Sequence, residues 1–250
     1  MIGILALVVQ VLSGSPSWAG PMSATELIAG VERQLSNIST LSVTIDRDVS
    51  TAILHCRHVI DFGTMRTRVD FPGKPSYRVS VDQGAHRWVM AYADGRTVTS
   101  PPIAWAVMPA TLPEPSSVFS LQETYGPWTE VGVVPSPEGA PGEFIITLKN
   151  GLLPPRGAIQ VLRIKQHPGL LLSVDGYTAS GQSTGSLVID WQAVGDIWVP
   201  RQVTRRSVLN DDSAIPRVAQ IVTRWSDVEI NQPLPQGWFT DPPALGLAHR

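Results

Sequence analysis

Residues 181–185, Gly-Gln-Ser-Thr-Gly, match the G-x-S-x-G pattern in which serine hydrolases hold their nucleophile. In those enzymes a strand precedes the serine and a helix follows it, so that a sharp turn presents the hydroxyl to a histidine. Here a strand-like run, 185–191, follows instead, and His249, second from the end of the chain, is the only later histidine. We therefore interpret the segment as a small-residue hairpin, and an esterase that uses Ser183 is our third functional hypothesis.

His55, Cys56 and His58 are residue types that bind metal ions. Successive side chains of a strand point to opposite faces, so His55 and His58 diverge, and no second Cys/His cluster completes a tetrahedral site. We predict no metal site. Cys56 is the single cysteine, which excludes a disulfide within the chain. We expect a buried, apolar thiol rather than a reactive one, because Leu54 and Ile60 share its strand face.

The remaining charged groups indicate neither a cofactor nor nucleic acid. Asp211 and Asp212 lie in a turn-forming run, where aspartate stabilises its own backbone. Glycine-rich phosphate loops are absent, so we predict no cofactor. Arg201, Arg205 and Arg206 could meet a phosphate or an acidic partner, but we favour a solvated strand face. A formal net charge of -2 lacks the clustered positive charge that nucleic-acid binding requires.

The composition predicts a globular protein. Of the 250 residues, 43% are hydrophobic and 16% are charged, which excludes a disordered chain and allows a sizeable core. Domains rich in β-structure commonly reach this length, so we predict one domain over residues 20–250.

The first 19 residues are typical of a signal peptide. The apolar run 2–12 is too short to cross a bilayer and long enough for a signal-peptide core. Small residues at Ser17 and Ala19 predict cleavage after Ala19 and export, to the periplasm or beyond. The basic residues expected before the apolar run are missing, so an N-terminus retained in the membrane is the alternative.

One amphipathic helix opens the predicted domain. Ser23 and Glu26 form a capping box, and Leu27, Val31 and Leu35 recur at helical spacing, which predicts a helix over 24–36.

After this helix the apolar residues follow a period of two, as in strands with one buried face. No long helix separates the strands, so they cannot be parallel, and we predict a large curved antiparallel sheet of the mainly β (α+β) class. Asp94-Gly95 is typical of a hairpin turn. The predicted strands are 41–46, 53–62, 65–71, 77–81, 87–92, 96–99, 143–149, 158–166, 170–177, 185–192, 197–207 and 218–230.

Prolines are concentrated in the middle of the chain, from Pro101 to Pro141. Proline interrupts both strand ladders and helices, so we predict a lid or loop over 101–142, with a short helix near 116–124. Apolar residues such as Trp105 and Phe119 persist there, which indicates that the segment packs on the domain.

Five local patterns resemble the LolA/LolB-like superfamily, the outer-membrane lipoprotein carrier-like exported proteins. The resemblance implies an incomplete antiparallel β-barrel with an N-terminal helix and a helix or loop lid on its concave face. The proline-rich middle departs from the carrier, as does Lys74, where that protein has arginine. The patterns are the helix and strand up to 46, Lys-Pro-Ser-Tyr-Arg at 74–78, Tyr-Ala-Asp-Gly-Arg-Thr at 92–97, the strand pair 189–200, and the proline-rich end 233–243.

The function that this resemblance implies is binding of a lipid or lipidated protein, with an acyl chain held in a hydrophobic concavity. The alternative is a regulatory or sensor module that binds a partner protein of the envelope through the same fold. The apolar alternation also fits an ordinary core, because it reports which face is buried and not what buries it. The candidate ligand-binding residues are Leu41, Val43, Ile45, Lys74, Val79, Val81, Trp88, Met90, Ile189, Trp191, Val199 and Trp225.

Overall fold

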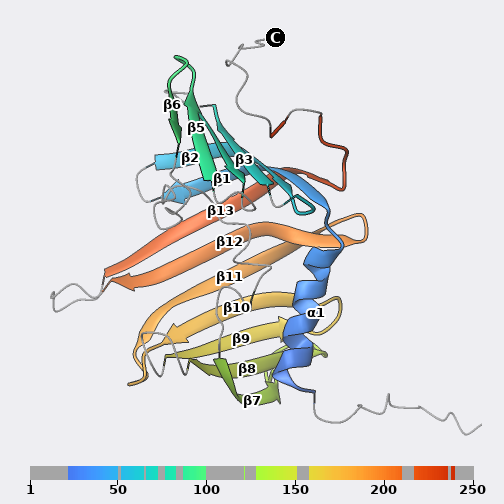
Figure 1. Ribbon diagram of the computed structural model, residues 1–250. Coiled ribbons are helices and arrows are strands. Elements are labelled where there is room, and N and C mark those ends of the chain that lie inside the picture. Colours follow the sequence, from blue (N-terminus) through green and yellow to red (C-terminus); the bar gives the residue numbers. More distant parts are fainter. Residues whose placement is uncertain are drawn as a thin grey trace, which may run out of the picture.

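Among the residues that the computed structural model describes, a single sheet of 13 strands forms the body of the protein, with helix α1 (Ala24–Ser36) lying across part of it (Figure 1). The structure describes residues 22–49, 52–64, 66–72, 77–82, 87–99, 121, 128–150, 158–209, 217–235 and 238–239. The strands are β1 (Thr40–Val49), β2 (Ala52–Asp61), β3 (Arg66–Phe71), β4 (Tyr77–Asp82), β5 (Arg87–Tyr92), β6 (Thr97–Thr99), β7 (Trp128–Pro135), β8 (Glu143–Asn150), β9 (Ile159–Lys165), β10 (Leu170–Tyr177), β11 (Ser183–Val194), β12 (Ile197–Leu209) and β13 (Arg217–Ile230).

The first strand, β1, and the last strand, β13, lie side by side in the interior of this sheet. Strands β1 to β6 follow one another out to one edge, β7 begins at the opposite edge, and β8 to β13 return to pair with β1. All of these strand pairs are antiparallel. Because β6 and β7 are separate edges, the sheet is not closed. The predicted fold class, a mainly β, incomplete antiparallel barrel with an N-terminal helix, is confirmed.

Helix α1 begins where the capping box predicted. The Ser23 Oγ accepts a hydrogen bond from the Glu26 N-H at 3.2 Å, and a Glu26 carboxylate oxygen accepts one from the Ser23 N-H at 2.9 Å. Both the backbone and the hydroxyl of Ser23 donate to this carboxylate and thereby lower the pKa of Glu26. The turn between β9 and β10 lies against the helix, since a Cβ at Gly169 would stand 2.5 Å from the Gly30 carbonyl oxygen. The cap and this contact fix both the start and the position of α1.

Strand β7 corrects the predicted extent of the proline-rich lid or loop. Residues 128–135, within the segment 101–142, form an edge strand instead. Prolines at the two ends of this run were interpreted as breaks in a ladder, but an edge strand tolerates proline because one side of its backbone pairs with nothing. Most of the rest of the segment lies outside the described residues. Leu121, which is described, is fully buried.

The side chain of Asn231, just after β13, joins the end of that strand to the connection between α1 and β1. Its Oδ1 accepts hydrogen bonds from the N-H of Ser39 at 2.7 Å and from the Ser39 hydroxyl at 3.0 Å. Its Nδ2 donates to the Asn37 carbonyl at 2.9 Å. With a φ of 56°, Asn231 has a left-handed backbone conformation, which asparagine tolerates better than most residues. The residue therefore fixes the junction between α1 and β1.

Replacement of Asn231 by alanine should lower the free energy of unfolding by about 2 kcal/mol, from lost hydrogen bonds and left-handed backbone strain. Asn231→Gly removes the same hydrogen bonds without that strain, so it should destabilise less than Asn231→Ala. Urea unfolding measures both changes. Equal unfolding midpoints for the two variants and the parent protein would show that the Asn231 side chain does not hold the junction.

Candidate ligand-binding face

The face of the sheet on which α1 lies, here called the inner face, carries most of the buried apolar side chains. Directly paired residues of antiparallel strands project on the same side. Ile45 pairs with Cys56 of β2 and with Trp225 of β13, and all three are buried. Toward the β6 edge, Val69 pairs with Val79 in the same way. The register thus aligns one apolar row after another across the strands.

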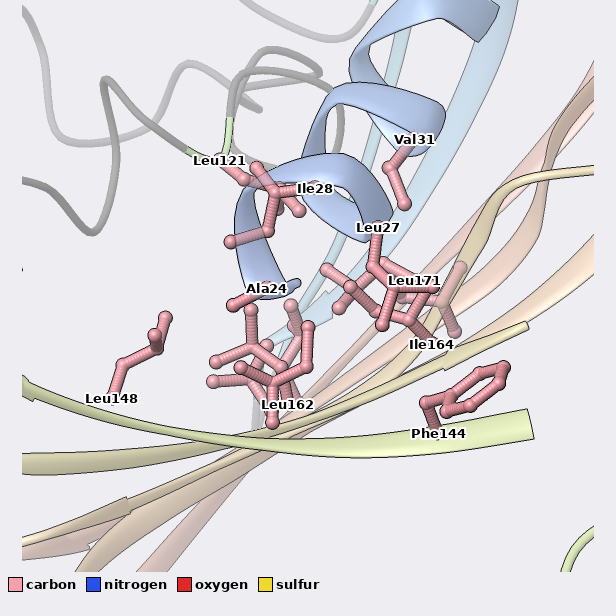
Figure 2. Packing of buried hydrophobic residues seen from close by; sticks show 14 residues of the cluster. Ala24, Leu27, Ile28, Val31, Leu121, Phe144, Leu148, Leu162, Ile164 and Leu171 are labelled. Carbon is pink, nitrogen blue, oxygen red and sulfur yellow. The ribbon is translucent and has the colours of Figure 1, made fainter. Parts of the chain in front are cut away.

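One group of inner-face residues, the helix-side cluster, packs between α1 and the sheet. Figure 2 shows the apolar side chains of α1 directed at those of the strands beneath, with Leu121 beside Ile28. The helix contacts β7, β9 and β10, among other strands. The buried members of the cluster are Ala24, Leu27, Ile28, Val31, Leu121, Phe144, Ile146, Leu148, Leu162, Ile164, Leu171, Val174, Leu187 and Ile189.

A second group, the strand-side cluster, lies on β1 to β4, β12 and β13. Its described members come from these strands and from Ile38, and none comes from α1. Trp191 contacts both clusters, so they adjoin on the inner face. The buried members are Ile38, Leu41, Val43, Ile45, Cys56, Ile60, Val69, Phe71, Val79, Val199 and Trp225.

The structure brings most of the predicted ligand-binding residues together in the strand-side cluster. Ile189 belongs to the helix-side cluster instead, and Trp191 to the boundary. Val81 and Trp88 pair with each other on β4 and β5, but their side chains are outside the described part, as is the whole of Lys74. The predicted residues found in or against the strand-side cluster are Leu41, Val43, Ile45, Val79, Met90, Val199 and Trp225.

These side chains are buried in the chain without any ligand. Leu41, Val43 and Ile45 have 0% of their surface exposed. An apolar, buried inner face is therefore shown, whereas ligand binding by these residues stays a prediction. Such burial is expected both in an ordinary core and in a ligand site that is covered when no ligand is bound.

Trp191 holds the boundary between the two clusters through a hydrogen bond that the sequence did not indicate. Its indole Nε1 donates to the Leu171 carbonyl oxygen at 2.8 Å. Register shifts interrupt the ladders beside both residues, between Leu171 and Ser173 and between Asp190 and Trp191. Such irregularities leave a backbone carbonyl available to a side chain, and strand periodicity does not reveal them.

The three potential metal ligands on β2 separate as predicted. His55 is exposed, and its Nδ1 lies 2.6 Å from an Asp46 carboxylate oxygen. Cys56 is buried in the strand-side cluster, and desolvation raises the pKa of its thiol to about 12, so the thiol stays protonated and inert. Among the described residues, no three His, Cys, Asp or Glu side chains are grouped closely enough to hold a metal ion.

His58, in contrast, is buried on the inner face beside Cys56. Only 3% of its surface is exposed, and desolvation lowers the pKa of its imidazole to about 3. Neither ring nitrogen has a hydrogen-bond partner in the part of the chain that the structure describes. From the sequence, His58 was considered only as a metal ligand, although the period-two pattern of β2 places it on the same face as Cys56 and Ile60.

On the opposite, outer face several charged residues are paired. The guanidinium groups of Arg57 and Arg68 lie 5.8 Å and 4.6 Å from the centre of the Trp238 ring, so the Trp238 side chain lies over β2 and β3. Arg201 donates to an Asp190 carboxylate oxygen at 2.8 Å. Arg201, Arg205 and Arg206 are all exposed. Arg206 projects on the outer face, whereas Arg205 pairs with Leu187 and therefore projects on the inner face.

The match to a hydrolase motif has a structural explanation. Ser183 is exposed at the start of β11, and a strand follows it as expected. Gly185, with a φ of 145°, lies where a Cβ would stand 2.2 Å from the Arg206 carbonyl oxygen. The last glycine of the pentapeptide is therefore required by close packing of β12. His249 lies outside the described residues.

An open antiparallel sheet with a helix packed on its inner face defines a class of half-barrel proteins, and within that class the fold is LolA-like. It is similar to a LolA superfamily protein from Nitrosomonas europaea, with a TM-score of 0.51 and 10% identity over 88% of this chain and 99% of that one. It is also similar to a domain from Vibrio parahaemolyticus described as an outer membrane lipoprotein-sorting protein domain. There the TM-score is 0.54 and the identity 10%, over 87% of this chain and 97% of that one.

No family model and no curated protein matches the chain. At these identities the similarity concerns the fold, and it confirms the fold predicted from the five local patterns. In the described part, no helix has the length and apolar character to span a bilayer.

His58 should make the protein sensitive to acid. Its pKa is about 3 in the folded protein, against an ordinary value of 6.5, so the unfolded chain binds the proton more readily. The stability that depends on neutral His58 is complete above about pH 6.5 and is lost as the pH falls toward 3, by at most about 5 kcal/mol. His58→Leu should flatten the dependence of the free energy of unfolding on pH, measured by urea unfolding between these limits.

The matched control for this experiment is His55→Gln, which changes an exposed histidine on the same strand. It should retain the loss of stability toward pH 3 that His58→Leu removes. A His58→Leu variant with the same slope as the parent protein would mean that His58 does not carry the acid sensitivity.

Proposed function

We propose that this protein is exported and binds an acyl chain of a lipid or of a lipidated protein on the strand-side half of its inner face. The observation that carries the proposal is the strand-side cluster, a continuous apolar wall built from six strands, to which α1 contributes no described member. The helix-side cluster already supplies a well-packed core of its own. The strand-side cluster can therefore exchange contacts within the chain for contacts with a ligand, with less loss of folding stability.

The physical reason for such a wall is the cost of exposing hydrocarbon to water. Each methylene that leaves water gains about 0.8 kcal/mol, so a lipid with two or three chains requires on the order of tens of kcal/mol of apolar contact. Val43, Val79 and Val199 present branched apolar side chains that a hydrocarbon tail can contact. The LolA-like fold, which includes a domain described as lipoprotein-sorting, supports the same assignment.

Binding must include a rearrangement, because the wall is buried before the ligand arrives. The acyl chain has to replace contacts that Leu41, Val43 and Ile45 already make within the chain. Affinity is then the difference between two sets of apolar contacts, which favours reversible binding over permanent retention. A carrier that must release its cargo requires this property.

We propose binding rather than catalysis. Ser183 is exposed in a hairpin, and the packing of Gly185 accounts for the motif around it. A sensor module that binds an envelope protein through the same fold is the competing function. The experiments below separate it from a lipid carrier.

Substitution of Met90 tests the binding face directly. Met90 is half-buried against the strand-side cluster, so glutamine there would place an unpaired amide against the acyl chain. Met90→Gln should weaken the binding of a dansyl-labelled fatty acid about tenfold, as measured by fluorescence titration. Val188→Gln is the matched control, because Val188 is 52% exposed, and it should bind as the parent protein does.

Native mass spectrometry of protein purified from the cell envelope gives the complementary result. A lipid that leaves upon organic extraction supports the carrier. A stoichiometric protein without lipid, together with no binding of the labelled fatty acid, would refute it in favour of the sensor module.

The export proposal also predicts the mature mass. Cleavage after Ala19 should leave a protein that begins at Gly20, because residues 1–19 have the pattern of a signal peptide. Intact mass spectrometry of the protein from fractionated cells measures this. A full-length chain in the cytosolic fraction would contradict export, whereas a full-length chain in the membrane fraction would indicate a retained N-terminus.

A further inference from the structure

His58 is a polar group at the centre of an apolar surface. In the sheet it pairs with Val43 on one side and with Val69 on the other, both members of the strand-side cluster. Cys56 and Ile60, the next residues on its own face of β2, belong to the same cluster. The imidazole is therefore bordered by buried apolar side chains along the strand and across it.

At this position the His58 imidazole contributes no stabilising hydrogen bond to the described part of the protein. A buried imidazole has one donor and one acceptor nitrogen when neutral, and each is costly to leave without a partner. Neither nitrogen of His58 has a partner among the described residues, and only 3% of the residue is exposed. A leucine would fill similar space without the polar cost. A buried polar group without a partner requires an explanation, and a ligand that supplies the missing hydrogen bond is one that fits an apolar binding face.

We propose that His58 is the polar anchor of the binding face, and that its imidazole N-H donates a hydrogen bond to the ester carbonyl of a bound acyl lipid. The inference rests on the proposed function, since it adds to acyl-chain binding a position at which the carbonyl is held. It names the ligand class as ester-linked acyl chains rather than hydrocarbon in general. Val43 and Val69, beside His58, then contact the first methylenes of the chain.

The chemistry of the site favours a neutral carbonyl over a charged group. Desolvation lowers the pKa of the imidazole to about 3, so His58 is neutral at physiological pH and offers no positive charge to a carboxylate or phosphate. Desolvation is the cause of this lowered pKa, and no charged group of the described residues contributes to it. A carbonyl oxygen, in contrast, accepts a hydrogen bond without bringing a charge into the apolar surroundings.

Paired ligands test the anchor. A diacyl phosphatidylcholine carries ester carbonyls, and the dialkyl ether phosphatidylcholine with the same head group and chain length carries none. Affinities of the mature protein for each lipid are measured by displacement of a dansyl-labelled fatty acid. The variants are His58→Leu, which removes the donor, and His58→Gln, which retains a donor and an acceptor. His55→Gln, on the outer face of the same strand, is the control.

The parent protein and His55→Gln should bind the ester lipid about tenfold more tightly than the ether lipid, as expected for one buried hydrogen bond. His58→Leu should bind both lipids equally, with the affinity for the ether lipid retained. His58→Gln should keep a measurable preference for the ester. His58→Leu should also raise the Tm of the ligand-free protein by about 2–4 °C, because it removes an unpaired polar group.

The possible failures are distinguishable. Equal affinities of the parent protein for the ester and ether lipids overturn the anchor and leave the acyl carrier intact. An ester preference that survives in His58→Leu places the carbonyl elsewhere and also overturns the anchor. Displacement by neither lipid and no binding of the labelled fatty acid refute the proposed function, and the anchor with it.

A measurement on the parent protein remains decisive if His58→Leu does not fold. The imidazole 15N resonances of His58, identified by their absence in His58→Gln, should shift when the ester lipid is added and should not shift equally with the ether lipid. An identical response to both lipids would overturn the proposed hydrogen bond.

Discussion

The pairing of β1 with β13 is the constraint on which the sheet depends, because along it the two halves of the described sheet meet. Each half is a meander that grows outward from this pair by short connections. Joining the first strand to the last closes a very long loop, which is the slow and entropically costly step of such topologies. Asn231 adds hydrogen bonds at one end of the pair, and Ile45 and Trp225 add buried contact within it. The continuity of the inner face follows from this register.

The local elements could be predicted from the sequence because their signals are local. The capping box at Ser23 determined the start of α1, and the Asp94-Gly95 turn corresponds to a hairpin in which Gly95 has a φ of 86°. The β1–β13 pair leaves no such signal, since any apolar strand can pair with any other. Strand β7 was missed for a related reason. Prolines at its two ends would break an interior strand but are tolerated in an edge strand. Whether a strand lies at an edge depends on the whole sheet and not on the segment alone.

The candidate face was predictable to the same extent and no further. Period-two alternation placed Leu41, Val43 and Ile45 on the buried side. It could not show that α1 packs on the half of the sheet that contains Ile189 and contributes no described member to the cluster of these three residues. Trp191 was assigned to a ligand, whereas its indole also holds the boundary between the clusters through the Leu171 carbonyl. That contact depends on register shifts, which arise from the pairing of whole strands.

Under the proposed function, the division of the inner face into two clusters meets two opposing requirements of a lipid carrier. A face that binds hydrocarbon must be apolar, yet exposing a well-packed apolar face to bind a ligand costs free energy. The helix-side cluster meets the requirement of stability, because α1 and the strands beneath it form a core that ligand binding does not disturb. In this proposal His58 meets the second requirement, because an imidazole without described partners makes the ligand-free strand-side cluster less stable than an all-apolar one. A ligand carbonyl that satisfies this group gains more than the same carbonyl does on a surface where every polar group is already paired. The instability of the closed state and the affinity of the bound state would then have the same origin.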